Sequence, residues 1–151
     1  MAEAGSTRNS RAARPLSPHL QVYRMTISMV MSILNRITGA ALYFGTLLLA
    51  WWLAALAAGP GYYEFVSAIL GSMLGKLVLL GYTWALVSHA LGGIRHFIWD
   101  TGKGYAISTI DTLCWVTLAL SVVITLLLWG MSGHLTRLLT QLAGAFTLFV
   151  S

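Results

Sequence analysis

The sequence predicts an all-α membrane protein with three transmembrane helices, and three observations lead to this class. Of its 151 residues, 58% are hydrophobic and only 9% are charged. The mean hydropathy of +0.78 lies well above that of soluble domains. A helix crosses the bilayer core in about 20 apolar residues, and three uncharged stretches approach or exceed that length, at 37–58, 77–94 and 112–131. Strands are a poor alternative, because these runs are long and apolar on all sides.

The elements before the second span can be placed from proline, glycine and charge. Residues 1–14 lack apolar periodicity and are expected to form a flexible tail. Two prolines then favour a non-helical segment along the inner membrane surface, before a helix begins near Thr26. Gly59, Pro60 and Gly61 should stop that helix. A second, surface helix is expected to run from Glu64 to Lys76 at the outer side.

The remaining elements follow the second span. Gly102, Lys103 and Gly104 predict a turn, with Thr109 or Asp111 as the cap of the third span. Residues 15–134 are expected to form one anchor domain. The apolar tail, residues 135–151, is too short beyond Arg137 to span comfortably. We therefore expect a short helix at the surface or packed on a partner, with a fourth span as the alternative.

The basic residues predict how the chain is oriented. Five arginines precede the first span, the connection at 59–64 has no Lys or Arg, and Arg95 and Lys103 flank the second connection. The positive-inside rule then places the N-terminus and the second connection in the cytoplasm and the C-terminus outside. The net charge of +5 is spread over these span ends, so it does not indicate a nucleic-acid surface. The short N-terminal tail favours a bacterial inner membrane over a mitochondrial one.

His89 is the first candidate for chemistry, because ionisable groups at membrane depth are costly and tend to serve a site. Neutral imidazole is a common ligand of haem iron. His96 is seven residues away, about 10.5 Å along a helix, so the two histidines cannot bind one iron. A haem at His89 would need a second ligand from another subunit, and Arg36, Arg95 and His96 lie at the level where its propionates would need cations. A core histidine bonded to a backbone carbonyl fits the spacing equally well.

Ser32 and Arg36 are four residues apart and therefore share one helix face at the cytoplasmic end of the first span. A hydroxyl and a guanidinium are donors suited to the carbonyl oxygens of a quinone. The alternative is an arginine that only reaches to lipid phosphate, and sequence alone favours that alternative. The single cysteine, Cys114, is expected to be a small core residue.

These residues resemble a known family, the cytochrome b556 subunits of succinate dehydrogenase. Three blocks carry the resemblance: Arg14-Pro15-Leu16-Ser17-Pro18-His19-Leu20 with Tyr23, then Ser32-Ile33-Leu34-Asn35-Arg36-Ile37-Thr38-Gly39, then the run from His89 to Gly102. The similarity covers about residues 14 to 131. One departure is Asn35, where the family usually has histidine, which puts a charged or proton-transferring role at that position in doubt.

The resemblance implies a membrane anchor of succinate:ubiquinone oxidoreductase. It implies that His89 is an axial ligand of haem b, with the second ligand from a smaller anchor subunit. Ser32 and Arg36 would line the ubiquinone site, and Arg36, Arg95 and His96 would surround the haem propionates. Further partners would be a flavoprotein, where succinate is oxidised, and an iron-sulfur subunit that passes electrons to ubiquinone. The chain itself would supply no catalytic residue for succinate oxidation.

Two alternatives stay open at this point. One is the anchor of a quinol:fumarate reductase, which runs the same chemistry in reverse. The other is a structural or transport subunit without haem, in which His89 and Arg36 belong to a packing or proton network.

Overall fold

The structure, a computed structural model, describes residues 24–150, with side chains to residue 147. It is all helical within this range, and three helices are long and apolar enough to cross a membrane. They are α1 (Ile27–Ala58), α3 (Met73–Asp100) and α4 (Ile107–Met131). The predicted fold class is therefore confirmed. The predicted tail and inner-surface segment, up to residue 23, lie outside the described residues.

The first span begins and ends where the sequence signals predict. Thr26, in an extended conformation, precedes the first residue of α1. Gly59 follows Ala58 with a φ of 115°, a conformation that favours glycine, and so ends the helix. Pro60 then occupies the first position of α2 (Pro60–Gly71), where its missing N–H costs nothing.

The boundary between α2 and α3 differs from the prediction. The surface helix was expected from Glu64 to Lys76, but α2 begins four residues earlier and ends at Gly71. Ser72 separates the helices, because its hydroxyl oxygen accepts a hydrogen bond from the amide of Gly75 at 3.1 Å and caps α3. Lys76 therefore belongs to the first turn and a half of a membrane span and not to the surface helix.

The turn between α3 and α4 is confirmed, but its cap is not. Gly102 and Gly104 have φ values of 75° and 79°, as a glycine turn requires. The residue that precedes α4 is Ala106, which forms no side-chain cap. Thr109 and Asp111 lie inside the helix, because α4 starts almost as soon as the second glycine has reversed the chain.

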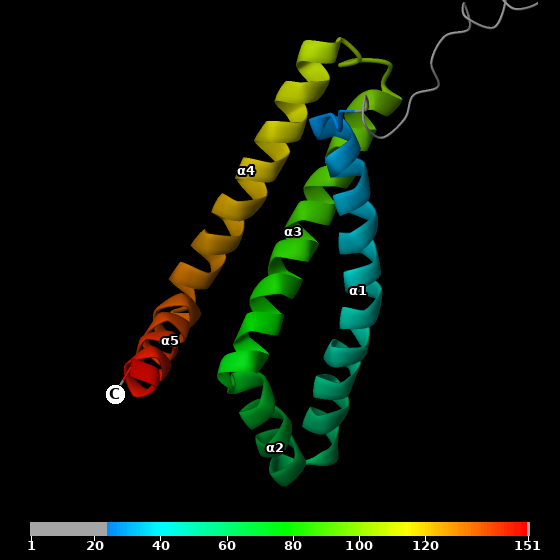
Figure 1. Ribbon diagram of the computed structural model, residues 1–151. Helices are drawn as coiled ribbons and strands as arrows, with labels where there is room; N and C mark the ends of the chain where they lie inside the picture. Colours follow the sequence, from blue (N-terminus) through cyan, green and yellow to red (C-terminus); the bar gives the residue numbers. More distant parts are fainter. Residues whose placement is uncertain (1–23, 151) are drawn as a thin grey trace, which may run out of the picture.

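The C-terminal tail forms α5 (His134–Val150), a short helix that packs against α3 and α4. Leu138 is its anchor, with a side chain that is only 2% exposed. Figure 1 shows α1 and α3 side by side, while α4 leans away from α3 toward the end of the bundle where α2 and α5 lie. We call this the α2/α5 end. In the described part of the chain α5 is not among the helices long and apolar enough to cross a membrane. The short C-terminal helix is thus confirmed, while its location at the membrane surface stays a prediction.

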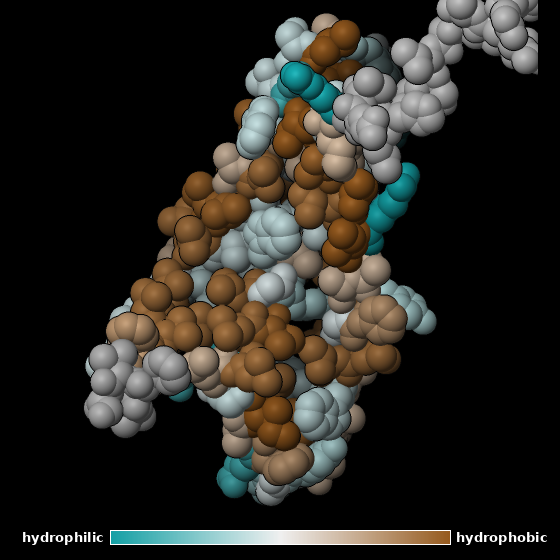
Figure 2. Space-filling model, viewed as in Figure 1, coloured by the Kyte–Doolittle hydropathy of each residue, from teal (hydrophilic) through white to brown (hydrophobic). Residues whose placement is uncertain are grey.

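Helix contacts inside the bundle rely on small and hydroxyl side chains, as is typical in membranes. The indole nitrogen of Trp84 donates to the hydroxyl of Ser121 at 3.1 Å, and that of Trp129 donates to Thr83 at 3.2 Å. Both bonds join α3 to α4. Large apolar side chains instead point outward, and Figure 2 shows hydrophobic residues over most of the visible face. Such a surface suits contact with lipid or with other subunits.

Candidate functional site

His89 lies on α3 with its ring against α1. Its Nδ1 atom is 3.1 Å from the backbone carbonyl oxygen of Asn35 and 3.4 Å from the hydroxyl oxygen of Thr38. The Thr38 hydroxyl donates its own hydrogen to the Leu34 carbonyl at 2.8 Å. Both neighbours of Nδ1 are therefore acceptors, which assigns the proton to Nδ1 and the lone pair to Nε2.

The other ring nitrogen is left available. Nε2 forms no hydrogen bond among the described residues and is not one of the enclosed polar atoms. The residue is half-buried, so the ring reaches the edge of this chain. Gly39 makes that placement possible, because a Cβ atom there would lie 3.0 Å from the Cε1 atom of His89. The carbonyl bond expected of a core histidine is present, yet it uses only one nitrogen.

Ser32 and Arg36 lie on α1 beside the contact with His89. With Gly39 they follow the spacing i, i+4, i+7, which places the three residues on one helix face. Both side chains are exposed and form no hydrogen bond or ion pair in the part of the chain that the structure describes. A row of two donors thus leads away from the imidazole, with Arg36 about 4.5 Å and Ser32 about 10.5 Å along the helix axis from Gly39.

The structure separates Arg95 from the other expected propionate residues. Its guanidinium is buried, with 3% exposure, and Nη1 approaches the sulfur of Cys114 on α4 at 3.4 Å. It also lies 5.1 Å from the centre of the Trp99 ring. His96 is exposed and, seven residues from His89, shares that residue's face of α3. Arg36 and His96 therefore lie toward the His89 side of the bundle, whereas Arg95 is directed at α4.

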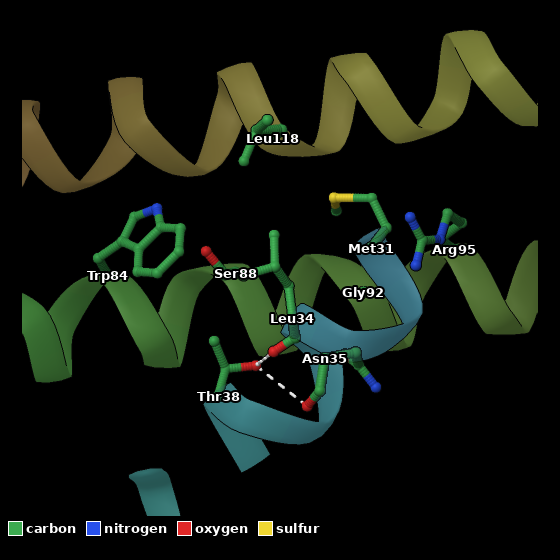
Figure 3. Close-up of a pocket in the computed structure, with 9 residues that line it drawn as sticks. All are labelled: Met31, Leu34, Asn35, Thr38, Trp84, Ser88, Gly92, Arg95 and Leu118. Carbon is green, nitrogen blue, oxygen red and sulfur yellow. Dashed lines mark hydrogen bonds between the residues drawn. The ribbon is translucent and has the colours of Figure 1, made fainter. Parts of the chain in front are cut away.

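Behind Arg95 the structure forms a small cavity of about 10 Å³ between α1, α3 and α4 (Figure 3). Three buried atoms around it have no hydrogen-bond partner among the described residues: Asn35 Oδ1, Ser88 Oγ and Arg95 Nε. The size and the three unpaired polar atoms suit a single water molecule. The Asn35 amide reaches this cavity past Gly92, where an added Cβ would lie 2.5 Å from Oδ1. Its side chain thus faces the interior and not the row of Ser32 and Arg36.

The sequence analysis did not find this cavity. Its signal was present, since Ser88 and Gly92 are small residues spaced by four on a span that also carries a buried arginine. The sequence could not show that Asn35, on α1, lies opposite these two residues of α3.

Comparison with known proteins gives the family. Residues 10–128 match the model of the succinate dehydrogenase/fumarate reductase transmembrane subunit. The chain belongs to this family. It is therefore a transmembrane anchor subunit of a succinate dehydrogenase or fumarate reductase complex, and the resemblance of its three sequence blocks is confirmed. The matched region contains all of α1, α2 and α3 and most of α4, but not α5.

Individual relatives agree with the family. The succinate dehydrogenase cytochrome b556 subunit of Paracoccus denitrificans is 42% identical over 118 residues, which cover 78% of this chain and 91% of the relative. That of Rickettsia felis is 39% identical, covering 77% and 90%. The mitochondrial cytochrome b560 subunit of Sus scrofa is 40% identical over 120 residues, covering 76% and 69%. The similarity thus extends from bacterial to mitochondrial proteins.

Proposed function

We propose that this chain anchors a succinate:ubiquinone oxidoreductase and supplies one axial ligand, Nε2 of His89, to haem b. The observation that carries the proposal is the bond from Nδ1 to the carbonyl of Asn35, because it holds the ring and leaves the other nitrogen with a lone pair at the edge of the chain. Histidines that bind metals commonly donate their second N–H to a carbonyl or carboxylate in this way. The relatives' names, cytochrome b556 and b560, support the same cofactor.

The residues of this chain fit a haem bound from one side only. His96 and His134 are the other described histidines, and neither approaches His89, so the second ligand would come from the smaller anchor subunit. A bound haem would supply a one-electron carrier inside the membrane. Arg36 and His96 are the residues we assign to its propionates. Arg95 is directed at α4. We therefore propose that it acts on the propionates through its positive charge and not by direct contact.

Ser32 and Arg36 are proposed to bind ubiquinone. Their exposed donors have no partner within the described chain, which leaves them available to the two acceptor oxygens of a quinone. A guanidinium held at a carbonyl oxygen stabilises the negative charge that develops there as electrons arrive. Reduction of the quinone to quinol takes two electrons and two protons. The electrons would come from succinate through the flavoprotein and iron-sulfur partners.

The membrane assignment completes the proposal. We place the chain in a bacterial inner membrane with the α3–α4 turn on the cytoplasmic side, since Arg24, Arg36 and Lys103 lie toward that end. Residues 59–72, which connect the spans α1 and α3, contain no Lys or Arg. The quinone residues would then face the side from which the peripheral subunits deliver electrons.

The test is the absorption spectrum of the purified complex. His89→Ala should abolish the b-type signal in the reduced-minus-oxidised difference spectrum, while His134→Ala, at the far end of the bundle, should leave it unchanged. An unaltered b-type signal in the His89 variant would remove the ligand assignment and favour the non-haem subunit. Initial rates measured in both directions, with succinate and with fumarate, distinguish the succinate dehydrogenase from the quinol:fumarate reductase.

A further inference from the structure

A second pocket lies at the α2/α5 end of the bundle, far from the residues proposed to bind haem and quinone. Its volume is about 260 Å³, and each of the five helices contributes to its wall: Trp52, Ser67, Lys76, Trp129 and His134, in the order of the helices. Lys76 and His89 are 13 residues apart on α3, which corresponds to about 20 Å along the helix. The pocket is therefore a separate site.

Lys76 brings a positive charge to this pocket without a negative partner. Its ammonium donates one hydrogen bond, to the side-chain oxygen of Gln141 on α5 at 2.9 Å, and no ion pair joins it to any carboxylate in the described chain. An ammonium carries three donors. Because a charge at the boundary of an apolar span is costly when it is unpaired, the site favours a ligand that carries negative charge.

The neighbouring polar groups can also donate. The Ser67 hydroxyl is enclosed and has no hydrogen-bond partner among the described residues, and its residue lines the same wall as Lys76. The ring of His134 lies 5.7 Å from that of Trp129, which orients it at the α5 side. No carboxylate lines the pocket. An acceptor-rich group is the complement of such a lining.

An apolar pocket adjoins this one. It has a volume of about 210 Å³ and shares Trp52, Leu70 and Leu79 with the pocket that contains Lys76. It continues along α1 past Leu48 and Leu49. A compartment that carries the Lys76 ammonium on its wall and leads into one without any charged residue suits an amphiphile, with its head at Lys76 and its hydrocarbon chain between α1 and α3.

We propose that this pair of pockets binds an anionic phospholipid from the leaflet at the α2/α5 end, with its phosphate at Lys76 and Ser67. The bilayer supplies such molecules, and basic pockets between membrane helices are suited to their headgroups. A neutral quinone would fit the shape but would leave the charge of Lys76 unpaired. Helix α5, which lies outside the family match, closes the site through Gln141 and His134.

The experiment uses the whole complex, purified in detergent and stripped of lipid. Phosphatidylglycerol is added in steps, and both the melting temperature and the lipid that stays bound in native mass spectrometry are measured. We expect phosphatidylglycerol to raise the melting temperature, and Lys76→Gln to weaken its apparent affinity about tenfold. Lys76→Arg should retain most of the affinity. Lys103→Gln, which removes an equal charge at the opposite end, is the matched control and should have no effect.

Three results would overturn the proposal. Phosphatidylcholine with the same acyl chains could bind as tightly as phosphatidylglycerol, the Lys76→Gln complex could bind phosphatidylglycerol unchanged, or decylubiquinone could displace the lipid at stoichiometric concentration. If Lys76→Gln does not assemble, Ser67→Ala provides the same comparison. The haem spectrum of each variant is recorded alongside, so that failure of the lipid site and failure of the proposed haem site give different readouts.

Discussion

Replacing Gly39 with alanine should disturb His89 without unfolding the bundle. The new Cβ would lie 3.0 Å from Cε1 of the imidazole, whereas carbon atoms in favourable contact are about 3.5–4.0 Å apart. The ring must therefore move by about 0.5 Å or more. If it moves directly away from α1, the bond from Nδ1 to the Asn35 carbonyl lengthens from 3.1 Å to about 3.6 Å, beyond hydrogen-bonding distance.

The two effects of Gly39→Ala on the free energy of unfolding nearly cancel. The lost hydrogen bond costs about 1 kcal/mol, while alanine is favoured over glycine inside a helix by about 1 kcal/mol. The melting temperature of the haem-free complex should thus hardly change, and a fall in that of the haem-loaded complex would reflect the haem it has lost. Loss of the bond that orients a metal ligand, in contrast, typically lowers metal affinity by roughly tenfold or more, so haem should be lost readily.

The assay is the ratio of haem to protein, measured after gel filtration, together with the b-type difference spectrum and the melting temperature. Gly81→Ala is the control, because a Cβ at that position in α3 meets nothing within 4 Å. We expect full haem content in Gly81→Ala and a clear deficit in Gly39→Ala. Full haem retention and an unshifted spectrum in the Gly39 variant would refute the idea that its contact with α1 holds the imidazole in place.

Three further predictions concern the proposed quinone site and the packing of the spans. Arg36→Ala should lower the rate of quinone reduction by at least about tenfold, as expected for loss of a charge-assisted hydrogen bond. Succinate oxidation with an artificial acceptor should persist. An equal loss of both activities would indicate misassembly. Ser32→Ala should raise the KM for quinone severalfold, as expected for one lost neutral hydrogen bond; an unchanged KM would exclude that contact. Gly45→Ala should lower the melting temperature, since its Cβ would overlap the Tyr82 ring and overpacking costs about 1–3 kcal/mol; an unchanged melting temperature would mean that the Tyr82 ring moves aside freely.

The ends of helices were predicted well only where a residue leaves the backbone little choice. Gly59 and the Gly102–Gly104 turn were identified correctly, because a positive φ favours glycine and because proline disrupts a helix beyond its first turn. The α2–α3 boundary was predicted wrongly. Ser72 caps α3 at a point where the chain bends, whereas other serines, such as Ser67 and Ser88, lie inside helices, so a serine by itself does not mark the start of a helix.

In the candidate site, too, the sequence indicates which residues share a helix face but not which contacts the helices make with one another. His89, Ser32, Arg36 and His96 lie toward one side of the bundle, as their positions on two helical faces allow. Arg95 was grouped with His96 because the two lie at the same depth in the membrane, yet neighbouring residues of a helix point about 100° apart. Only the packing of α3 on α4 decides that the guanidinium is buried beside Cys114.

Taken by itself, the sequence determined the membrane class, the three spans and the residue types available for ligation, because apolar length and the cost of burying ionisable groups are properties of the chain alone. The tertiary structure decided which nitrogen of His89 is available, which cation is buried and which helices enclose the lipid pocket. Those features depend on contacts between atoms far apart in sequence, such as Nδ1 of His89 with the carbonyl of Asn35 and Lys76 with Gln141, and no local pattern specifies which atoms packing brings together.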